Sequence, residues 1–270
     1  MDLGLKGRTA LVTAASRGFG LATARLLAQE GCKVGMCARG EEDLAEAAGD
    51  VRAAGEDVWG GRGGRVRHRA VDVRDAAAMA GFADLVERDL GPIDLLLVNA
   101  GGPPAGGFDE LSPADWEAGY RLTIESAVGL CRLVLPGMMA RRFGRIVAVT
   151  SVAALQPVEN LVLSNALRPA VHGLVKSLSD HAAGRGVTVN AVAPGFHATS
   201  AVERLIAAKT AQTGCTREDV IAGWTRAIPA GRLGEADELA ALIAFLMSAQ
   251  AGYITGQCVV ADGGWVRGAF

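Results

Sequence analysis

The segment TAASRGFG, residues 13–20, has the residue types and spacing of a phosphate-binding turn. Gly18 would let the backbone approach a pyrophosphate closely, and Gly20 would let the following helix pack tightly on the preceding strand. The start of that helix offers unpaired N–H donors to an anion. The segment therefore predicts a dinucleotide site, and an ordinary strand-to-helix turn is the alternative. The candidate cofactor contacts in it are Thr13, Ser16, Arg17, Gly18, Phe19 and Gly20.

A second signal stands at the end of the next predicted strand, where Arg39 follows the run KVGMCA. A carboxylate at this place binds the ribose 2′-hydroxyl of NAD, whereas an arginine accommodates the 2′-phosphate of NADP. Arg17 adds a second guanidinium, and two guanidinium groups can hold a phosphate by charge-assisted hydrogen bonds. The sequence predicts NADP(H) in preference to NAD(H). The alternative is that both arginines simply face solvent.

Short apolar runs alternate with helical patterns along the chain, which predicts a parallel sheet with helices on both faces. The expected class is α/β, as a single doubly wound Rossmann-like domain of about seven strands over residues 1–270. A glycine-rich loop is expected over 55–64. Strands are predicted over 8–13, 33–38, 66–73, 93–100, 145–151, 187–195 and 257–264, and helices over 18–30, 41–54, 75–90, 112–142, 161–183 and 235–248.

Composition and charge indicate which partners and which compartment the protein is expected to have. The 270 residues carry a net charge of −2, so no charge excess points to nucleic acid or to an anionic membrane as a partner. The five cysteines are scattered without metal-ligand spacing, which predicts a reducing compartment and no metal site. The N-terminus lacks the layout of a signal peptide, and no apolar run reaches the length of a membrane span. These features predict a cytoplasmic protein.

Five motifs in order resemble those of the short-chain dehydrogenase/reductase family, in its 3-oxoacyl-carrier-protein-reductase-like branch. TAASRGFG resembles TGxxxGxG with Ala14 in place of the first glycine, VNAGG (98–102) resembles NNAG, and PGFHAT (194–199) matches PGxxxT. Asp72-Val73 resembles the adenine contact, and YITGQCVVADGG resembles the C-terminal signature. The resemblance covers essentially the whole chain.

This resemblance implies a nicotinamide cofactor, hydride transfer to a ketone or from an alcohol, and a homotetramer or homodimer. In the family, the long helices before and after the fifth strand pack against symmetry mates. The further cofactor contacts that it implies are Asp72, Val73, Asn99, Ala100, Gly101, Arg168, Pro194, Gly195 and Thr199.

The sequence departs from the family at its Asn, Ser, Tyr and Lys site. Ser151 occupies the serine place, but Thr123, Ser164 and Arg168 stand at the asparagine, tyrosine and lysine places. A serine hydroxyl is a far weaker acid than a tyrosine, whose pKa is about 10. Arginine stays protonated, so Arg168 can supply charge and hydrogen bonds to ribose but cannot relay a proton. Pro169 predicts a helix that starts late or kinks at this point.

Another group could replace the missing acid. His197 lies in PGFHAT, which borders the nicotinamide in the family, and histidine titrates near neutrality. A polar loop residue is the alternative role. His172 lies on the altered helix and is a second candidate for proton transfer, with a solvent-facing position as the alternative. Glu159 and Asn160 border the expected pocket, with loop surface as their alternative role.

Residues 198–232 are expected to form a helical lid over the cofactor. Leu205, Ile206, Ile221 and Trp224 give it an apolar side, and with the loop at 101–108 they predict a mainly apolar carbonyl or alcohol substrate. Simple core packing is the alternative for each of them. Three functions remain open: an NADP(H)-dependent oxidoreductase with a modified proton-transfer site, a lyase or isomerase on the same scaffold, and a catalytically silent nucleotide-binding protein.

Overall fold

A parallel seven-stranded sheet in the order β3-β2-β1-β4-β5-β6-β7 forms the centre of the protein, in a computed structural model that describes residues 1–61 and 64–268. The five inner strands are almost entirely buried on both faces, which explains the continuous apolar runs of the sequence, whereas the edge strands β3 and β7 are partly exposed. Their bounds are β1 Thr9–Thr13, β2 Lys33–Ala38, β3 Val66–Ala70, β4 Ile93–Val98, β5 Gly144–Val149, β6 Val187–Pro194 and β7 Cys258–Ala261.

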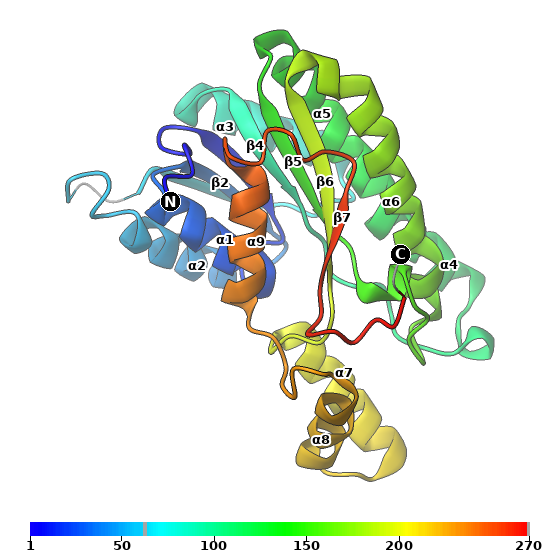
Figure 1. The fold of residues 1–270 in the computed structure, drawn as a ribbon. Coiled ribbons are helices and arrows are strands. Elements are labelled where there is room, and N and C mark those ends of the chain that lie inside the picture. The colour runs from blue at the N-terminus through cyan, green and yellow to red at the C-terminus, as the bar shows by residue number, and fades with distance from the viewer. Residues whose placement is uncertain (62–63, 269–270) are drawn as a thin grey trace.

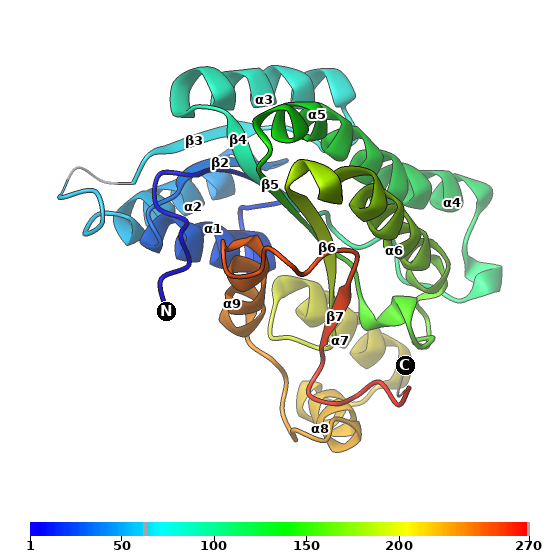
Figure 2. The ribbon, with the colours of Figure 1, turned by 45° about the horizontal axis from the view of Figure 1, so that its top comes forward.

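Helices cover both faces of this sheet (Figures 1 and 2). On one face α1, α2 and α9 pack together, and on the other α3, α5 and α6 lie side by side. The bounds are α1 Gly18–Gln29, α2 Glu41–Ala54, α3 Ala76–Leu90, α4 Pro113–Tyr120, α5 Ser126–Arg141, α6 Val162–Ala182, α7 Ser200–Thr213, α8 Arg217–Ala227 and α9 Ala236–Met247. The predicted doubly wound α/β fold is confirmed.

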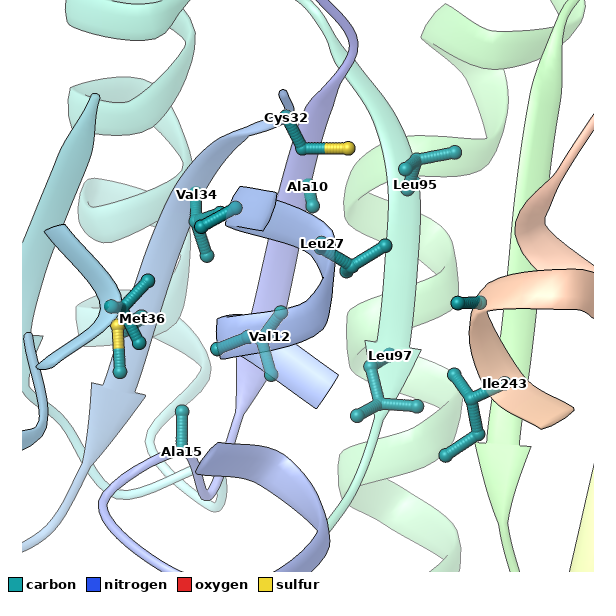
Figure 3. Close-up of a cluster of buried hydrophobic side chains, with 14 of the residues drawn as sticks. Ala10, Val12, Ala15, Leu27, Cys32, Val34, Met36, Leu95, Leu97 and Ile243 are labelled. Carbon is teal, nitrogen blue, oxygen red and sulfur yellow. The ribbon is translucent and has the colours of Figure 1, made fainter. Parts of the chain in front are cut away.

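One of the two main apolar cores lies between the sheet and the α1–α9 layer (Figure 3). Val12 and Leu97, from neighbouring strands, point toward Leu27 of α1 and Ile243 of α9, and all four side chains are completely buried. This packing fixes α1 against β1. The turn that joins them is therefore held at the point where the strand order reverses between β1 and β4, the place where open α/β sheets bind ligands.

Two helices differ from the sequence prediction. The helix predicted over 112–142 contains a π-helical turn, Arg121–Glu125, between α4 and α5. The prediction of a late start at Pro169 was wrong, because α6 runs from Val162 to Ala182 with this proline inside it. Pro169 is exposed, so the carbonyl that its ring leaves without a donor can bind water. The predicted loop 55–64 includes residues 62 and 63, which lie outside the described residues.

The continuous helix Pro113–Arg141 is also long and apolar enough to cross a membrane by length and composition alone, with a mean hydropathy of 1.4 in its most apolar window. Core helices of layered α/β proteins pass the same test. This helix packs on β4, β5, α3 and α6, and Leu130, Val134 and Met138 are buried in the second main core. The buried part of its apolar surface, 44% of that window, therefore covers the sheet.

Candidate active site

The turn between β1 and α1 has the tight backbone that its glycines predict. Ala14 has a φ of 49° and Gly18 a φ of 55°, both in the left-handed region. A Cβ atom added to Gly20 would lie 2.3 Å from the carbonyl oxygen of Ala14, so only glycine lets α1 begin this close to the turn. The alanine that replaces the first glycine of the family motif thus adopts the conformation of a glycine, at a cost in backbone strain.

The first turn of α1 is open to a ligand. Arg17 is the N-cap residue and forms no side-chain cap hydrogen bond, so no side chain occupies the N–H donors of the first turn. The Arg17 guanidinium is exposed and lies 3.9 Å from Asp43. Arg39 is exposed at the end of β2. The nearby carboxylate of Glu41 is directed elsewhere, since its Oε2 accepts a hydrogen bond from the N–H of Ala70.

Thr13 supports this turn from behind. Its side chain is completely buried, and its hydroxyl lies 3.0 Å from the carbonyl of Leu97 and 2.7 Å from that of Asn99. The same oxygen accepts from the N–H of Asn99 at 2.9 Å. Thr13 was predicted as a cofactor contact, but the structure directs its hydroxyl at β4. It fixes the end of β4, and with it the segment that carries Asn99, Ala100 and Gly101.

Asp72, the predicted adenine contact, lies beyond β3 beside Val73. Its carboxylate accepts from the guanidinium of Arg74 at 2.7 Å. This hydrogen bond, assisted by the charge of Arg39, holds the pKa of Asp72 below its usual value. Asp72 therefore remains a carboxylate at neutral pH, and Arg39 lies close enough to feel its charge.

The predicted nicotinamide loop meets the glycine turn. A Cβ atom on Gly18 would lie 3.8 Å from the side chain of Thr199. His197 is buried, with its ring edge-on to Phe19 at 5.2 Å between centroids. Its Nδ1 lies 3.2 Å from the carbonyl of Gly195, and burial lowers its pKa. These contacts give His197 a packing role beneath the turn; they do not direct it toward Ser164 or Arg168.

Thr123 and Arg168 line one small cavity together with Ala100 and Gly101. The Thr123 hydroxyl and the Arg168 Nε are both buried, and neither has a hydrogen-bond partner within the described residues. Nη1 of Arg168 donates to the carbonyl of Val149 at 2.8 Å. Burial lowers the pKa of this guanidinium to about 10, so it is still a cation at neutral pH. Buried polar groups ordinarily have partners, and these two atoms therefore point to a polar ligand.

The two serines come from either side of the β5–α6 connection. Ser151 follows β5, and its hydroxyl accepts from the N–H of Ala153, which starts a short 3₁₀ turn, Val152–Ala154. That turn packs against α6, which carries Ser164 in its first turn. The Ser164 side chain is mostly buried, and its hydroxyl makes no hydrogen bond to any described residue. Its donor is therefore available to a ligand.

His172 is half-buried, and its ring is directed inward instead of toward solvent, the alternative that the sequence offered. It lies one helical turn after Arg168, and its Nε2 is 2.8 Å from the hydroxyl of Thr150 and 3.3 Å from Sγ of Cys258. The pKa of His172 is lowered by burial and then by the charge of Arg168. The Thr150 hydroxyl also reaches the carbonyl of Val192 at 2.9 Å. Sequence reasoning missed this pairing, because the rotation of α6 that produces it is set by packing on the sheet.

The region predicted to hold the substrate is bounded by two loops and two helices. Glu159 and Asn160 are exposed, as their loop-surface interpretation expects. The loop 101–108 is joined to the start of α6, since the N–H of Gly106 donates to the carbonyl of Asn160 at 2.7 Å. Residues of α7 and α8 form a separate small apolar cluster of Val202, Ile206 and Val220, against which Ile221, Trp224 and Leu233 pack.

These features fit a dinucleotide. The uncapped helix start, the glycine backbone and the exposed Arg39 suit its phosphates, and the unpartnered atoms of Thr123 and Arg168 suit a hydroxylated ligand at the other end of the crevice. Among the described residues no group of three or more His, Cys, Asp or Glu side chains is arranged to hold a metal ion.

The fold and this crevice define a class, and comparison with known proteins gives the same result. The family profile described as "Enoyl-(Acyl carrier protein) reductase" matches residues 13–266. The chain belongs to the short-chain dehydrogenase/reductase family of oxidoreductases. The family resemblance that the motifs suggested is confirmed.

Several of the similar proteins are named as reductases. The chain is 33% identical to the 3-oxoacyl-[acyl-carrier-protein] reductase of Escherichia coli strain K12, over 97% of this chain and 98% of that protein. L-sorbose reductase from Gluconobacter frateurii, solved with NADPH and L-sorbose, has a TM-score of 0.90 at 29% identity, covering 99% and 100% of the two chains. An NADPH-bound short chain oxidoreductase from Pseudomonas aeruginosa PAO1, described as containing an atypical catalytic center, has a TM-score of 0.86 at 34% identity, covering 97% and 98%.

Proposed function

We propose that this protein is an NADP(H)-dependent oxidoreductase that interconverts a carbonyl and an alcohol, with Ser164 and Arg168 in place of the tyrosine and lysine of its family. The observation that carries the proposal is the pair of buried polar atoms without partners, the Thr123 hydroxyl and the Arg168 Nε, in a cavity that Ala100 and Gly101 also line. Similarity to structures solved with NADPH supports the choice of cofactor.

Cofactor binding is assigned to the carboxyl edge of the sheet. The N–H groups at the start of α1 bind the pyrophosphate, and Arg17 and Arg39 bind the 2′-phosphate. The Glu41 carboxylate is engaged with the N–H of Ala70, and the exposed Asp43 carboxylate, 3.9 Å from Arg17, is the group that a bound 2′-phosphate would displace from this guanidinium. We assign Asp72 and Val73 to the adenine, and the remaining contacts to Ser16, Gly18, Phe19, Gly20, Asn99, Ala100, Gly101, Arg168, Pro194, Gly195 and Thr199.

When bound, the reduced nicotinamide supplies a hydride to the carbonyl carbon. The hydroxyls of Ser151 and Ser164 donate to the carbonyl oxygen and orient it. Arg168 keeps its charge at neutral pH, and this positive charge stabilises the negative charge that develops on that oxygen. Ser164 transfers the proton more slowly than a tyrosine would, since its hydroxyl is a much weaker acid.

Residues 198–232 act as the substrate lid in this proposal, and the apolar surface of α7 and α8 favours a mainly apolar substrate. The single domain of residues 1–270 assembles as a homotetramer or homodimer through the α4–α5 helix and α6. Two large apolar side chains of the α4–α5 helix, Tyr120 and Leu133, are exposed for this contact. A cytoplasmic location, without nucleic acid or membrane as a partner, completes the proposal.

Measuring the turnover of NADPH with carbonyl substrates tests this proposal. The protein is incubated with NADPH and a panel of ketones and diketones, and the absorbance of NADPH is followed for the parent chain, Ser164→Ala and Arg168→Met. We expect oxidation of NADPH by the parent and a loss of at least tenfold in both variants. Ser177→Ala is the matched control. Ser177 is an exposed serine of the same helix, and its hydroxyl donates to the backbone carbonyl of Gly173. Tight NADPH binding with no turnover on any member of the panel would contradict the redox proposal and favour a lyase, isomerase or silent protein.

A further inference from the structure

The C-terminal segment 262–267, named here the C-terminal strap, leaves β7 in a conformation set by Asp262. The carboxylate of Asp262 accepts from the N–H of Gly264 at 2.8 Å and from the N–H of Val266 at 2.7 Å. Gly263 has a φ of 65°, which lets the chain turn back at this point. A Cβ atom on Gly195 would lie 2.7 Å from Cβ of Asp262, so the strap is seated directly on the predicted nicotinamide loop.

The strap also contacts the α7–α8 pair. The ring of Phe196 stacks on Trp224 of α8 at 4.6 Å between centroids, and Trp265 of the strap meets the same phenyl ring edge-on at 5.7 Å. The carbonyl of Gly263 accepts from the N–H of Ala230, which follows α8, at 3.0 Å. Three separate segments of the chain therefore share one aromatic cluster.

Arg267 joins the two sides of the crevice. Its Nη2 donates to the carbonyl of Ala227, the last residue of α8, at 3.2 Å. Its backbone N–H donates to Oε1 of Gln156 at 3.1 Å. Gln156 lies in the connection between Ser151 and α6, and Figure 1 shows the red C-terminal segment running from the end of β7 past α7 toward the start of α6.

The α7–α8 pair has little else to hold it in place. Its apolar cluster is separate from the two main cores, and among the described residues it contains three buried side chains, Val202, Ile206 and Val220. An element with a small cluster of its own opens at a low free-energy cost unless neighbouring segments restrain it. The contacts of Trp265 and Arg267 are such restraints.

We infer that the C-terminal strap is a third wall of the substrate pocket, and that Arg267 is a positioning residue that holds the α7–α8 lid against the connection carrying Ser151. This inference rests on the proposed function. Substrate binds between those two sides, so a loosened strap weakens substrate binding. The phosphate contacts of the cofactor are assigned to α1 and β2 and do not involve the strap.

The test uses Arg267→Ala, Gln156→Ala and the double variant in the full-length chain. Hydrogen–deuterium exchange of the amides in Ser200–Thr213 and Arg217–Ala227 is measured without substrate, together with the affinity for NADPH. Loss of each hydrogen bond is expected to raise exchange about three- to tenfold and to leave NADPH affinity unchanged. With a ketone that the parent reduces, KM rises by a similar factor while kcat is retained. Arg185→Ala is the control, because Arg185 is exposed and its side chain forms no hydrogen bond or ion pair with the described residues.

Unchanged exchange in the double variant would overturn the inference, and so would a parallel loss of NADPH affinity. If no ketone is reduced by the parent chain, the proposed function fails, and the exchange rates still decide whether the strap restrains α7 and α8.

Discussion

Replacing Gly20 with alanine tests whether the turn between β1 and α1 must be as tight as the structure has it. The added Cβ would lie 2.3 Å from the carbonyl oxygen of Ala14 and 2.9 Å from Cα of Ala15. Observed Cβ contacts essentially never fall below 3.0 Å, so the start of α1 must move away by at least 3.0 − 2.3 = 0.7 Å. Both neighbours are backbone atoms, which cannot rotate aside as the end of a side chain can.

The expected cost is that of an overpacked core site, about 1–3 kcal/mol of the free energy of unfolding. The displaced N–H groups would also bind a pyrophosphate less well. A loss of about 1.4 kcal/mol there lowers NADPH affinity tenfold. Urea denaturation measures the stability, and fluorescence titration measures the binding.

Gly49→Ala is the matched control. Gly49 lies in the exposed interior of α2, and a Cβ atom added to it would meet nothing within 4 Å. Alanine is the better helix former by about 1 kcal/mol, so this variant is expected to be more stable and to bind NADPH unchanged. If Gly20→Ala is as stable as the parent chain and binds NADPH equally well, the assignment of the phosphate site to this turn is contradicted.

Three further substitutions probe the interior of the site. Thr13→Val leaves the N–H of Asn99 and two carbonyls without their buried partner, so we expect the free energy of unfolding to fall by about 1–3 kcal/mol in urea denaturation. An unchanged midpoint would show that the Thr13 hydroxyl does not hold the end of β4. Arg168→Met removes a buried cation that has no carboxylate partner among the described residues, so thermal stability should be retained or raised while turnover is lost; a strongly destabilised variant would show that the charge supports the fold. The pKa of His172 is lowered in the folded protein, so the unfolded chain takes up that proton first and stability falls as the pH drops below the ordinary histidine value of about 6.5. His172→Gln should reduce this acid sensitivity, measured as the unfolding free energy between pH 7 and pH 5, and an identical pH profile would exclude the mechanism.

The strands of the sheet were predictable because their burial is reflected in their own residue composition. A parallel strand covered on both faces must be apolar throughout, and Ile93–Val98 has that composition. The end of this strand was placed two residues too late, at Ala100. The sequence does not reveal that the hydroxyl of Thr13 takes the N–H of Asn99 and ends the strand there. The edge strand β3 was also predicted too long, since it ends at Ala70 and not at Val73.

The site was predictable only where one motif contains it. Gly18 and Gly20 follow from the spacing of a phosphate turn, but the direction of a side chain on α6 depends on how that helix is rotated against the sheet. His172 therefore turned inward to Thr150 although nothing near it in the sequence indicates this. The bond between Gln156 and Arg267 joins residues 111 positions apart, and such contacts are set by the tertiary fold alone.

The account depends most on a dinucleotide whose pyrophosphate binds at the start of α1 and whose 2′-phosphate binds to Arg17 and Arg39. Calorimetric titration of the purified chain with NADPH and with NADH tests this directly, and Arg39→Ala provides the matched comparison. Charge-assisted hydrogen bonds of about 1.5–3 kcal/mol predict that NADPH binds roughly 10- to 100-fold more tightly than NADH, and that Arg39→Ala removes most of this difference. Tighter binding of NADH, or no binding of either nucleotide, would contradict the account.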